Sequence, residues 1–293
     1  MKRIINFILF GNIYIAIAAA CLVQSTVTQI GILNFNYYYS ILVFFATLFI
    51  YNLQRIFYKK GEDKSLNSIR RKWIFDNQIT IKILTLIGFV GVAVTFFFND
   101  YKIIIYLSPL LLLSLAYFIP FIKLRKSAWF KLCTLAIVWT IATAAVPILL
   151  ILVPILIRDP LQYHYIVCGK LSLHIATRFC FMLAICIPFD IRDINIDTAE
   201  NVTTLPHKLG EETTRNIALL FTSIYSILIV IEYFISIISL WSLIALLISM
   251  IATFVLILFS SSKRSEYYYV AGIDGTMILQ GVLLMITAYF TSF

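Results

Sequence analysis

Apolar stretches of about twenty residues recur along the whole chain, separated by short polar connections. A helix of that length crosses the hydrocarbon core of a bilayer, so the pattern predicts nine transmembrane helices. The tight connections at Phe98–Lys102 and near Ser236 predict helical hairpins, and Pro147 and Pro154 predict a kink in the fifth span. The predicted spans are 4–23, 38–57, 80–98, 103–122, 133–157, 172–189, 216–233, 236–259 and 272–291.

The composition supports the same conclusion. Hydrophobic residues make up 61% of the 293 positions, charged residues only 13%, and the mean hydropathy is +0.96. A soluble domain carries about 25% charged residues, so we expect one all-α integral membrane domain over 1–293. The net charge of +9 resides in short connections between apolar stretches, and this distribution argues against nucleic-acid binding.

Lysine and arginine are divided unequally between the two sets of connections. Seventeen lie on the side of the N-terminus and of the connections after spans two, four, six and eight, whereas only Lys102, Arg158 and Lys170 lie on the other side. Because basic residues accumulate in cytoplasmic loops, we expect a cytoplasmic N-terminus and a C-terminus outside. The expected location is a bacterial inner membrane, with the protein embedded in its lipid bilayer.

The connection after the sixth span has the most distinctive polar pattern. Asp190, Asp193 and Asp197 directly follow an apolar segment, at spacings of three and four residues. If the helix continues, these spacings place the three carboxylates on one stripe. Like charges on one stripe repel, so we expect a compensating cation, and Mg²⁺ prefers such oxygen ligands and often bridges to a substrate phosphate. The alternative is a solvated loop whose acids interact with Arg192 and Lys208.

With the spans and this connection placed, the chain resembles the UbiA superfamily of intramembrane prenyltransferases. Members have nine transmembrane helices and two Asp-rich motifs, which follow helices two and six. The second motif reads roughly D-x-x-D-x-x-x-D and is followed by T-L-P and a glycine. The matching residues here are Asp190, Asp193, Asp197, Thr204-Leu205-Pro206 and Gly210. A weaker similarity follows span four, at Tyr117, Pro120, Lys123 and Arg125.

The first Asp-rich motif is where the chain departs from the family, whose pattern is approximately N-D-x-x-D-x-x-x-D. Asn52 matches, but the three Asp positions are occupied by Leu53, Ile56 and Lys60. In the family each motif holds Mg²⁺ against the diphosphate of the prenyl donor, so this chain retains residues for only one of the two metal sites. Arg55 and Lys60 are cationic where the family has anions, and we expect them to contact the diphosphate in place of a metal ion.

The resemblance implies an enzyme that transfers a prenyl group from a polyprenyl diphosphate to a lipophilic, usually aromatic, acceptor with the help of Mg²⁺. Metal ions and basic side chains stabilise the departing pyrophosphate, and aromatic faces stabilise the allylic cation. The residues implied in catalysis and metal binding are Asp190, Asp193 and Asp197. Those expected to contact the diphosphate are Asn52, Arg55, Lys123, Arg125, Lys131, Arg192 and Lys208.

Two alternative functions stay open on the sequence alone. The missing first motif favours a catalytically impaired relative that binds an isoprenoid lipid or a partner protein. A secondary transporter would instead have Gly- or Pro-interrupted helices in both halves of the chain, with charges at mid-membrane. Only the fifth predicted span has such an interruption, so the transporter is the least favoured of the three functions.

The sequence also suggests roles for charged residues outside the Asp-rich connection. Arg70-Arg71-Lys72 is typical of a basic patch facing lipid, with a cap over the substrate as the alternative. His174 and Arg178 are predicted to form a structural pair in span six, with Glu232 as a further partner. Asp274 either joins the polar mouth of a cavity or is the N-terminal carboxylate of the ninth span.

Overall fold

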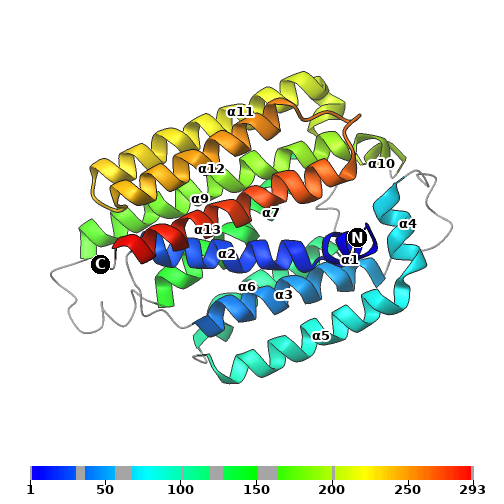
Figure 1. Cartoon of the computed structure of the whole chain (residues 1–293), viewed down its shortest axis with the longest axis horizontal. Coiled ribbons are helices and arrows are strands. Elements are labelled where there is room, and N and C mark those ends of the chain that lie inside the picture. The colour runs from blue at the N-terminus through cyan, green and yellow to red at the C-terminus, as the bar shows by residue number, and fades with distance from the viewer. Residues whose placement is uncertain are drawn as a thin grey trace.

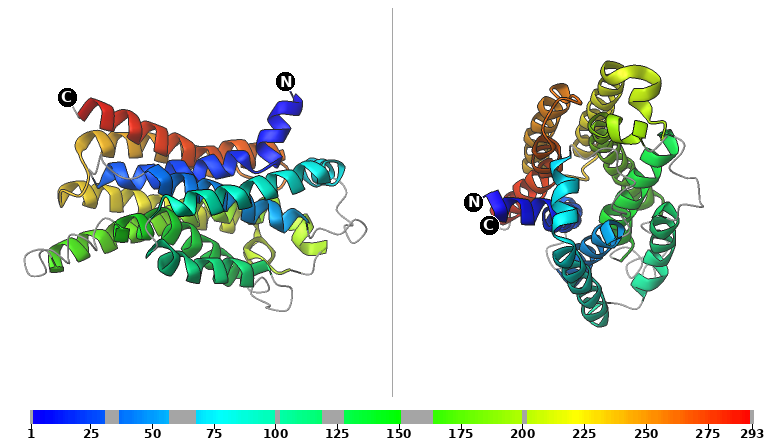
Figure 2. Two further views of the ribbon diagram at one scale, coloured as in Figure 1. Left: turned by 90° about the horizontal axis from the view of Figure 1, so that it is seen from below. Right: turned by 90° about the vertical axis from the view of Figure 1, so that its right-hand side faces the viewer.

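The computed structural model describes residues 2–30, 37–56, 68–99, 102–118, 128–150, 164–199 and 202–291. Within these ranges every regular element is a helix, and the long helices run side by side in one bundle (Figures 1 and 2). Helix α1 (Lys2–Phe10) begins at one end of the bundle, and α13 (Asp274–Thr291) ends at the other (Figure 1). The all-helical fold predicted from the sequence is confirmed.

The helices follow the apolar stretches of the sequence. After α1, the long helices are α2 (Ile13–Gln29), α3 (Tyr37–Ile56), α5 (Gln78–Phe97), α6 (Lys102–Phe118), α7 (Ala128–Thr140), α9 (His164–Arg192), α11 (Leu205–Phe234) and α12 (Leu240–Leu258). The shorter elements are α4 (Ile69–Asp76), α10 (Ile194–Ala199) and two π-helical segments, η2 (Ile141–Ala145) and η3 (Tyr268–Ile273).

Seven helices in the described part of the chain are long and apolar enough to cross a membrane, and the bent pair α1–α2 makes an eighth candidate. Helix α6 is shorter, with 17 described residues. The protein is therefore a multi-pass membrane protein, while the count of nine spans and the orientation of the termini stay predictions. Pro154, the second proline expected to kink the fifth span, lies outside the described residues.

The first span differs from the continuous helix predicted over 4–23. The structure breaks it at Gly11 and Asn12, and α1 and α2 meet at an angle of 57°. Asn12 has a φ of 61°, in the left-handed region. Asparagine tolerates this conformation better than most residues because its short polar side chain forms local hydrogen bonds. Apolar periodicity does not register such a break, since both halves of the span remain apolar.

A π-helical segment, η2, lies just before Pro147 in the fifth predicted span, while the kink predicted at Pro147 stays a prediction. Proline has no N–H, so Pro147 leaves the carbonyl of Thr143, four residues earlier, without its usual donor. Segment η2 covers this position, as π-helical turns often mark such irregularities. The hydroxyl of Thr26 on α2 donates to the Thr143 carbonyl at 2.8 Å, and that of Tyr39 on α3 donates to the Ala142 carbonyl at 2.7 Å.

Helices α3 and α5 touch backbone to backbone at Gly88. A Cβ atom at this position would lie 2.7 Å from the backbone nitrogen of Phe49 and 2.8 Å from its Cα. Small residues allow membrane helices to approach this closely, because packing rather than the hydrophobic effect holds them together inside lipid. The contact fixes α5 against α3, which carries part of the site described below.

Helix α9 is the best covered helix of the bundle. It packs against α11 on one side and α7 on another, while α13 packs against α2 and α12. All residues from Phe181 to Ile187 are buried, as expected of a helix enclosed by its neighbours. Helix α9 therefore brings its last turn, with Asp190 and Arg192, to the end of the bundle where α4 and α10 lie (Figure 1).

Candidate functional site

A polar pocket of about 200 Å³ lies at this end of the bundle, and we call it the charged pocket. Its walls come from α1, α2, α3, α4, α7, α9, α10, η3 and α13. Charged residues are scarce in this chain, yet nine of them line this small volume. The basic residues are Arg55, Arg70, Arg71, Lys131 and Arg192, and the acidic ones are Asp190, Asp193, Asp197 and Asp274.

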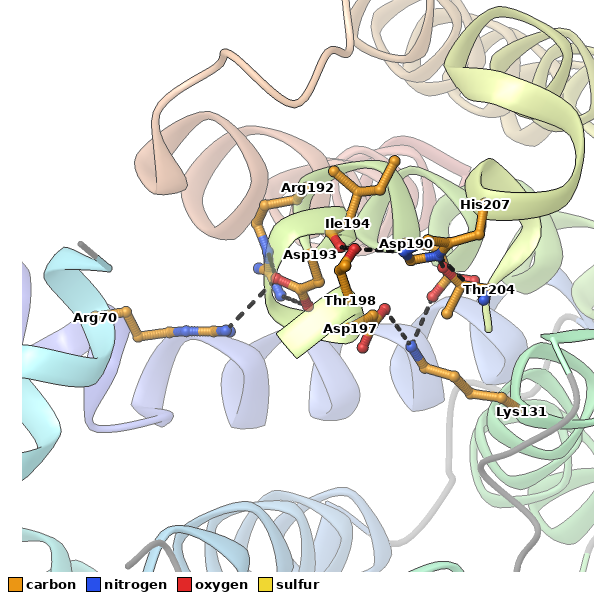
Figure 3. A network of polar contacts seen from close by, with 10 residues as sticks. All are labelled: Arg70, Lys131, Asp190, Arg192, Asp193, Ile194, Asp197, Thr198, Thr204 and His207. Atoms are coloured by element: carbon orange, nitrogen blue, oxygen red, sulfur yellow. Dashed lines mark hydrogen bonds and ion pairs between the residues drawn. The ribbon is translucent and has the colours of Figure 1, made fainter. Parts of the chain in front are cut away.

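The three aspartates predicted to lie on one helical stripe contact different basic side chains. Helix α9 ends at Arg192, Asp193 stands in a turn, and α10 begins at Ile194. Figure 3 shows the carboxylates of Asp190 and Asp197 directed to Lys131, whereas the carboxylate of Asp193 is directed to Arg192 and Arg70. The compensating cation expected from the sequence is thus supplied by the protein's own basic side chains.

Lys131 reaches the pocket from α7. Its Nζ lies 2.8 Å from Oδ1 of Asp190 and 3.3 Å from Oδ2 of Asp197, within hydrogen-bond distance of both. The side chains are 14%, 3% and 5% exposed, in the order Lys131, Asp190, Asp197. Charges this deeply buried require close partners. Among the described residues, the second oxygen of Asp190 has no hydrogen-bond partner, so the carboxylate keeps unused acceptor capacity.

Asp193 is held by two parallel hydrogen bonds from its neighbour Arg192. Nε and Nη2 of Arg192 donate to Oδ1 and Oδ2 at 2.7 and 2.6 Å, and Nη2 of Arg70 lies 3.8 Å from Oδ1. Burial alone would raise the pKa of Asp193, but the Arg192 guanidinium outweighs burial and holds this pKa well below its usual range. Arg192 is itself placed over the rings of Phe189 and Tyr269, at 4.7 and 5.9 Å from their centroids.

Asp197 has the opposite electrostatic character. Burial raises its pKa to about 6, although the ammonium group of Lys131 opposes this effect, and the negative charges of Asp193 and Asp190 add to it. The two aspartates that follow the end of α9 therefore differ in protonation behaviour. Asp193 stays ionised at any physiological pH, whereas Asp197 gains a proton at mildly acidic pH.

Helix α4 brings two arginines to the pocket through a capped N-terminus. The Ser68 hydroxyl accepts a hydrogen bond from the Arg71 backbone N–H at 3.2 Å and donates one to the Glu266 carboxylate. Glu266 also accepts a bond from the Arg70 backbone N–H at 2.6 Å. A carboxylate and a Ser cap both stabilise a helix start. The interpretation as a lipid-facing patch is wrong for Arg70 and Arg71, which line the charged pocket, while Lys72 is exposed.

The structure places the other residues predicted from the sequence in different surroundings. Arg55 on α3 is 9% exposed and lines the charged pocket. Asn52 does not line it, because its amide is engaged between helices. Lys208 is exposed on α11. Lys123 and Arg125 lie outside the described residues. Asp274 lines the pocket and is also the first residue of α13, so both interpretations of this residue agree with the structure.

The carboxylates do not fit the magnesium site that the resemblance implies. Mg²⁺ takes oxygen ligands at about 2.0–2.1 Å in octahedral geometry. Lys131 stands between Asp190 and Asp197, and Arg192 covers both oxygens of Asp193. In the described part of the chain no three Asp, Glu, His or Cys side chains converge on one point suited to a metal. The expected ligand set of three aspartates is therefore not formed.

An apolar pocket of about 430 Å³ adjoins the charged one, and we call it the tail pocket. It lies among α3, α5, α6, α7 and η2, and almost all of its lining is hydrophobic. Four residues line both pockets: Tyr51, Gln54, Leu135 and Trp139. The indole N–H of Trp139 donates to the Tyr51 hydroxyl at 3.2 Å, so an aromatic pair stands at the junction.

The segment after the aspartates ties α10 to α11. The backbone N–H of Thr204, the N-cap of α11, donates to Nδ1 of His207 at 3.3 Å, and Nε2 of His207 meets the Thr198 hydroxyl at 2.7 Å (Figure 3). Gly210 then adopts φ 82° and ψ 164°, a conformation open only to glycine. Thr204 of the sequence motif is thus linked through His207 to α10, the helix that carries Asp197.

A second buried polar group lies near the middle of α9. Nδ1 of His174 is 3.1 Å from Oε2 of Glu232, and Arg178 donates to Gln280 at 3.0 Å and to Ser25 at 2.9 Å. These contacts join α9 to α2, α11 and α13. Glu232 is the partner of His174, as predicted, while the structural role of His174 and Arg178 stays a prediction.

The fold and this arrangement of pockets define a polytopic membrane protein built as an all-helical bundle. Among solved structures, the chain is similar to digeranylgeranylglyceryl phosphate synthase, a UbiA-superfamily prenyltransferase studied for biosynthesis in membranes, with a TM-score of 0.54 and 14% sequence identity. The match covers 98% of this chain and 99% of that one. No family model and no curated protein sequence matches the chain. The resemblance to the UbiA superfamily is confirmed for the fold.

Proposed function

We propose that the protein is an intramembrane prenyltransferase that binds a prenyl diphosphate and transfers its prenyl group to a lipophilic acceptor. The observation that carries this proposal is the junction of the charged pocket and the tail pocket at Tyr51 and Trp139. A prenyl diphosphate is an anionic head on a long apolar tail, and the two pockets match these parts in polarity and in order. The name of the structural neighbour supports prenyl transfer in general.

The chemistry requires that the C–O bond to the diphosphate ionise and that both products be stabilised. Basic side chains of the charged pocket would neutralise the departing pyrophosphate. The rings of Tyr51 and Trp139, which line both pockets, would stabilise the allylic cation through cation–π attraction. The tail pocket would exclude water from the cation, which would otherwise be captured by hydrolysis.

In this proposal Asp190, Asp193 and Asp197 act as positioning residues as well as charges. Asp193 orients Arg192, and Asp190 and Asp197 orient Lys131. Fixed orientation matters because preorganised groups stabilise developing charge without a reorganisation cost.

The test is incubation of the purified protein with labelled geranyl, farnesyl and longer prenyl diphosphates, together with lipid-extract acceptors, with and without Mg²⁺. We expect pyrophosphate release and a labelled lipid product. Asp193→Ala should lower the rate at least tenfold, about 1.4 kcal/mol, because Arg192 loses its orientation. Lys72→Ala, an exposed residue on α4, is the matched control. Unchanged activity in Asp193→Ala would remove this carboxylate from the mechanism.

A catalytically impaired isoprenoid-binding protein is the second candidate. It is favoured by Leu53 and Ile56, which replace two aspartates of the family's first motif, and by the engagement of the remaining carboxylates with basic residues. Saturable binding of farnesyl thiodiphosphate, with no product from any prenyl diphosphate, would select this candidate over the enzyme.

A further inference from the structure

We propose that the charged pocket binds its anionic headgroup without a divalent cation, with Lys131, Arg192 and the arginines of α3 and α4 in the role of the metal. This inference rests on the proposed function, because it concerns how the same headgroup is held. It departs from the metal-bridged binding that the resemblance implies. Three observations carry it, each from a different wall of the pocket.

The first observation is the position of Lys131. Its Nζ lies between the carboxylates of Asp190 and Asp197, at 2.8 and 3.3 Å, where a bridging metal ion would need to be. An ammonium group is a compact positive charge with three donors, and here it holds both carboxylates at the edge of the pocket. A divalent cation at this point would meet strong repulsion from the ammonium group.

The second observation is the bidentate pair of Arg192 and Asp193. Both oxygens of Asp193 accept hydrogen bonds from one guanidinium, at 2.7 and 2.6 Å, and the Arg192 side chain is only 9% exposed. Charge-assisted bidentate pairs are among the strongest polar contacts in proteins. A metal ion would have to break this pair to gain Asp193 as a ligand, so the third carboxylate is also withheld from it.

The third observation is the set of arginines that α3 and α4 bring to the pocket. Arg55 occupies the segment of α3 that corresponds to the first motif, and Arg70 and Arg71 extend from the capped start of α4. The lining has five basic and four acidic residues, a balance of +1 before a ligand enters. Guanidinium groups match phosphate oxygens in planar, two-point geometry. Arg55 thus brings a guanidinium group into the pocket from the segment where the family's first motif has its aspartates.

The primary test compares the affinity of the wild-type protein for farnesyl thiodiphosphate, a non-reacting donor analogue, in EDTA and in Mg²⁺. We expect the two dissociation constants to agree within about threefold. A loss of tenfold or more in EDTA that is restored by Mg²⁺, about 1.4 kcal/mol, would overturn the inference while leaving the proposed function intact. Absence of binding in both buffers would overturn the proposed function and this inference with it.

The second test uses Lys131→Ala, which deletes the internal cation and leaves two buried carboxylates facing each other. We expect Mg²⁺ to bind this variant and to raise its Tm by at least about 3 °C, whereas the wild type shows no shift. Lys72→Ala should behave like the wild type, since this lysine is exposed. A saturable Mg²⁺-dependent Tm shift in the wild-type protein would refute the inference, and that result does not depend on whether the variant folds.

Discussion

The side-chain amide of Asn12 donates a hydrogen bond to Oδ1 of Asn52 at 3.0 Å, across the break between α1 and α2. Nδ2 of Asn52 donates in turn to the carbonyls of Gly11 and Leu48, at 3.0 and 2.9 Å. Asn52 is fully buried. The one residue that matches the family's first motif thus holds a helix break in place. Its part in the site is to fix the helix that carries Arg55.

Replacement of Asn52 by alanine should therefore destabilise the fold. The change leaves the Asn12 amide and the Gly11 carbonyl without partners, and we expect a loss of about 1–3 kcal/mol in the free energy of unfolding. The measurement is denaturant unfolding in detergent micelles. A double-mutant cycle with Asn12→Ala should give a coupling energy above about 0.5 kcal/mol. Additive effects would show that the two amides do not act together.

The close contact of α3 and α5 makes a prediction about two glycines. Gly88→Ala should destabilise the protein by about 1–3 kcal/mol, because the new Cβ would press on the backbone of Phe49. Gly169→Ala on α9 is the control: no atom lies within 4 Å of its added Cβ, so it should be neutral or stabilising by about 0.5–1 kcal/mol. Thermal unfolding of the two variants side by side measures the difference. Equal Tm values would contradict the packing described here.

The raised pKa of Asp197, about 6, predicts a pH dependence of stability with a defined sign. Between pH 4 and 6 the folded state binds more protons at this residue than the unfolded state, whose Asp pKa is about 3.9. The contribution of Asp197 to stability is therefore greatest at the acidic end and is lost as the pH rises through 6.

Asp197→Asn removes this titration and isolates its effect. We expect the stability of the variant, relative to that of the wild type, to increase by about 1–3 kcal/mol between pH 4 and pH 7. Denaturant unfolding at a series of pH values gives the difference directly. A wild-type to variant difference that stays flat over this range would show that the Asp197 pKa is not raised.

Arg55 is predicted to contact the anionic headgroup. Arg55→Ala should weaken binding of farnesyl thiodiphosphate at least tenfold, about 1.4 kcal/mol, because a charge-assisted contact is lost in a buried pocket. Arg55→Lys should recover only part of the affinity, since an ammonium group lacks the two-point geometry of a guanidinium. Isothermal titration calorimetry in EDTA distinguishes the two variants. Unchanged affinity in Arg55→Ala would exclude it from the headgroup site.

The tail pocket should select the length of the prenyl donor. Ala46 on α3 lines it, and Ala46→Phe would fill part of its volume of about 430 Å³. We expect longer prenyl diphosphates to lose affinity while geranyl diphosphate is little affected. Ala93→Phe, at an exposed position of α5, is the matched control. A uniform loss for all chain lengths in Ala46→Phe would indicate a folding defect instead.

The helices and the site were predictable from the sequence to different degrees. The membrane helices follow from apolar length, which the bilayer imposes on any spanning segment. The aspartates follow from their spacing and from the residues after them. Lys131 was placed among the phosphate contacts, but its position between Asp190 and Asp197 depends on how α7 packs against α9. No local pattern encodes that packing.

The prediction that Arg70 and Arg71 face lipid was wrong for a related reason. A run of basic residues beside a membrane helix is usually attracted to lipid headgroups. Here the capping of α4 by Ser68 and by Glu266, almost two hundred residues further along the chain, directs two of the three basic side chains inward. The local sequence does not reveal a cap formed by Glu266, because that residue is distant along the chain. The N-cap Ser68 could be recognised from the local sequence.

The π-helical segment before Pro147 bears on how the protein would select the length of its prenyl donor. The hydroxyls of Thr26 on α2 and Tyr39 on α3 donate hydrogen bonds to carbonyls of the π-helical segment η2. Ala142 and Thr143 of this segment form part of the wall of the tail pocket. Because this part of the wall is hydrogen-bonded to two neighbouring helices, we expect it to keep its position when a longer prenyl chain enters. Isoprene units that do not fit the tail pocket would have to extend between the helices into the lipid. The size of the side chains that face the pocket would therefore set the length of the preferred donor.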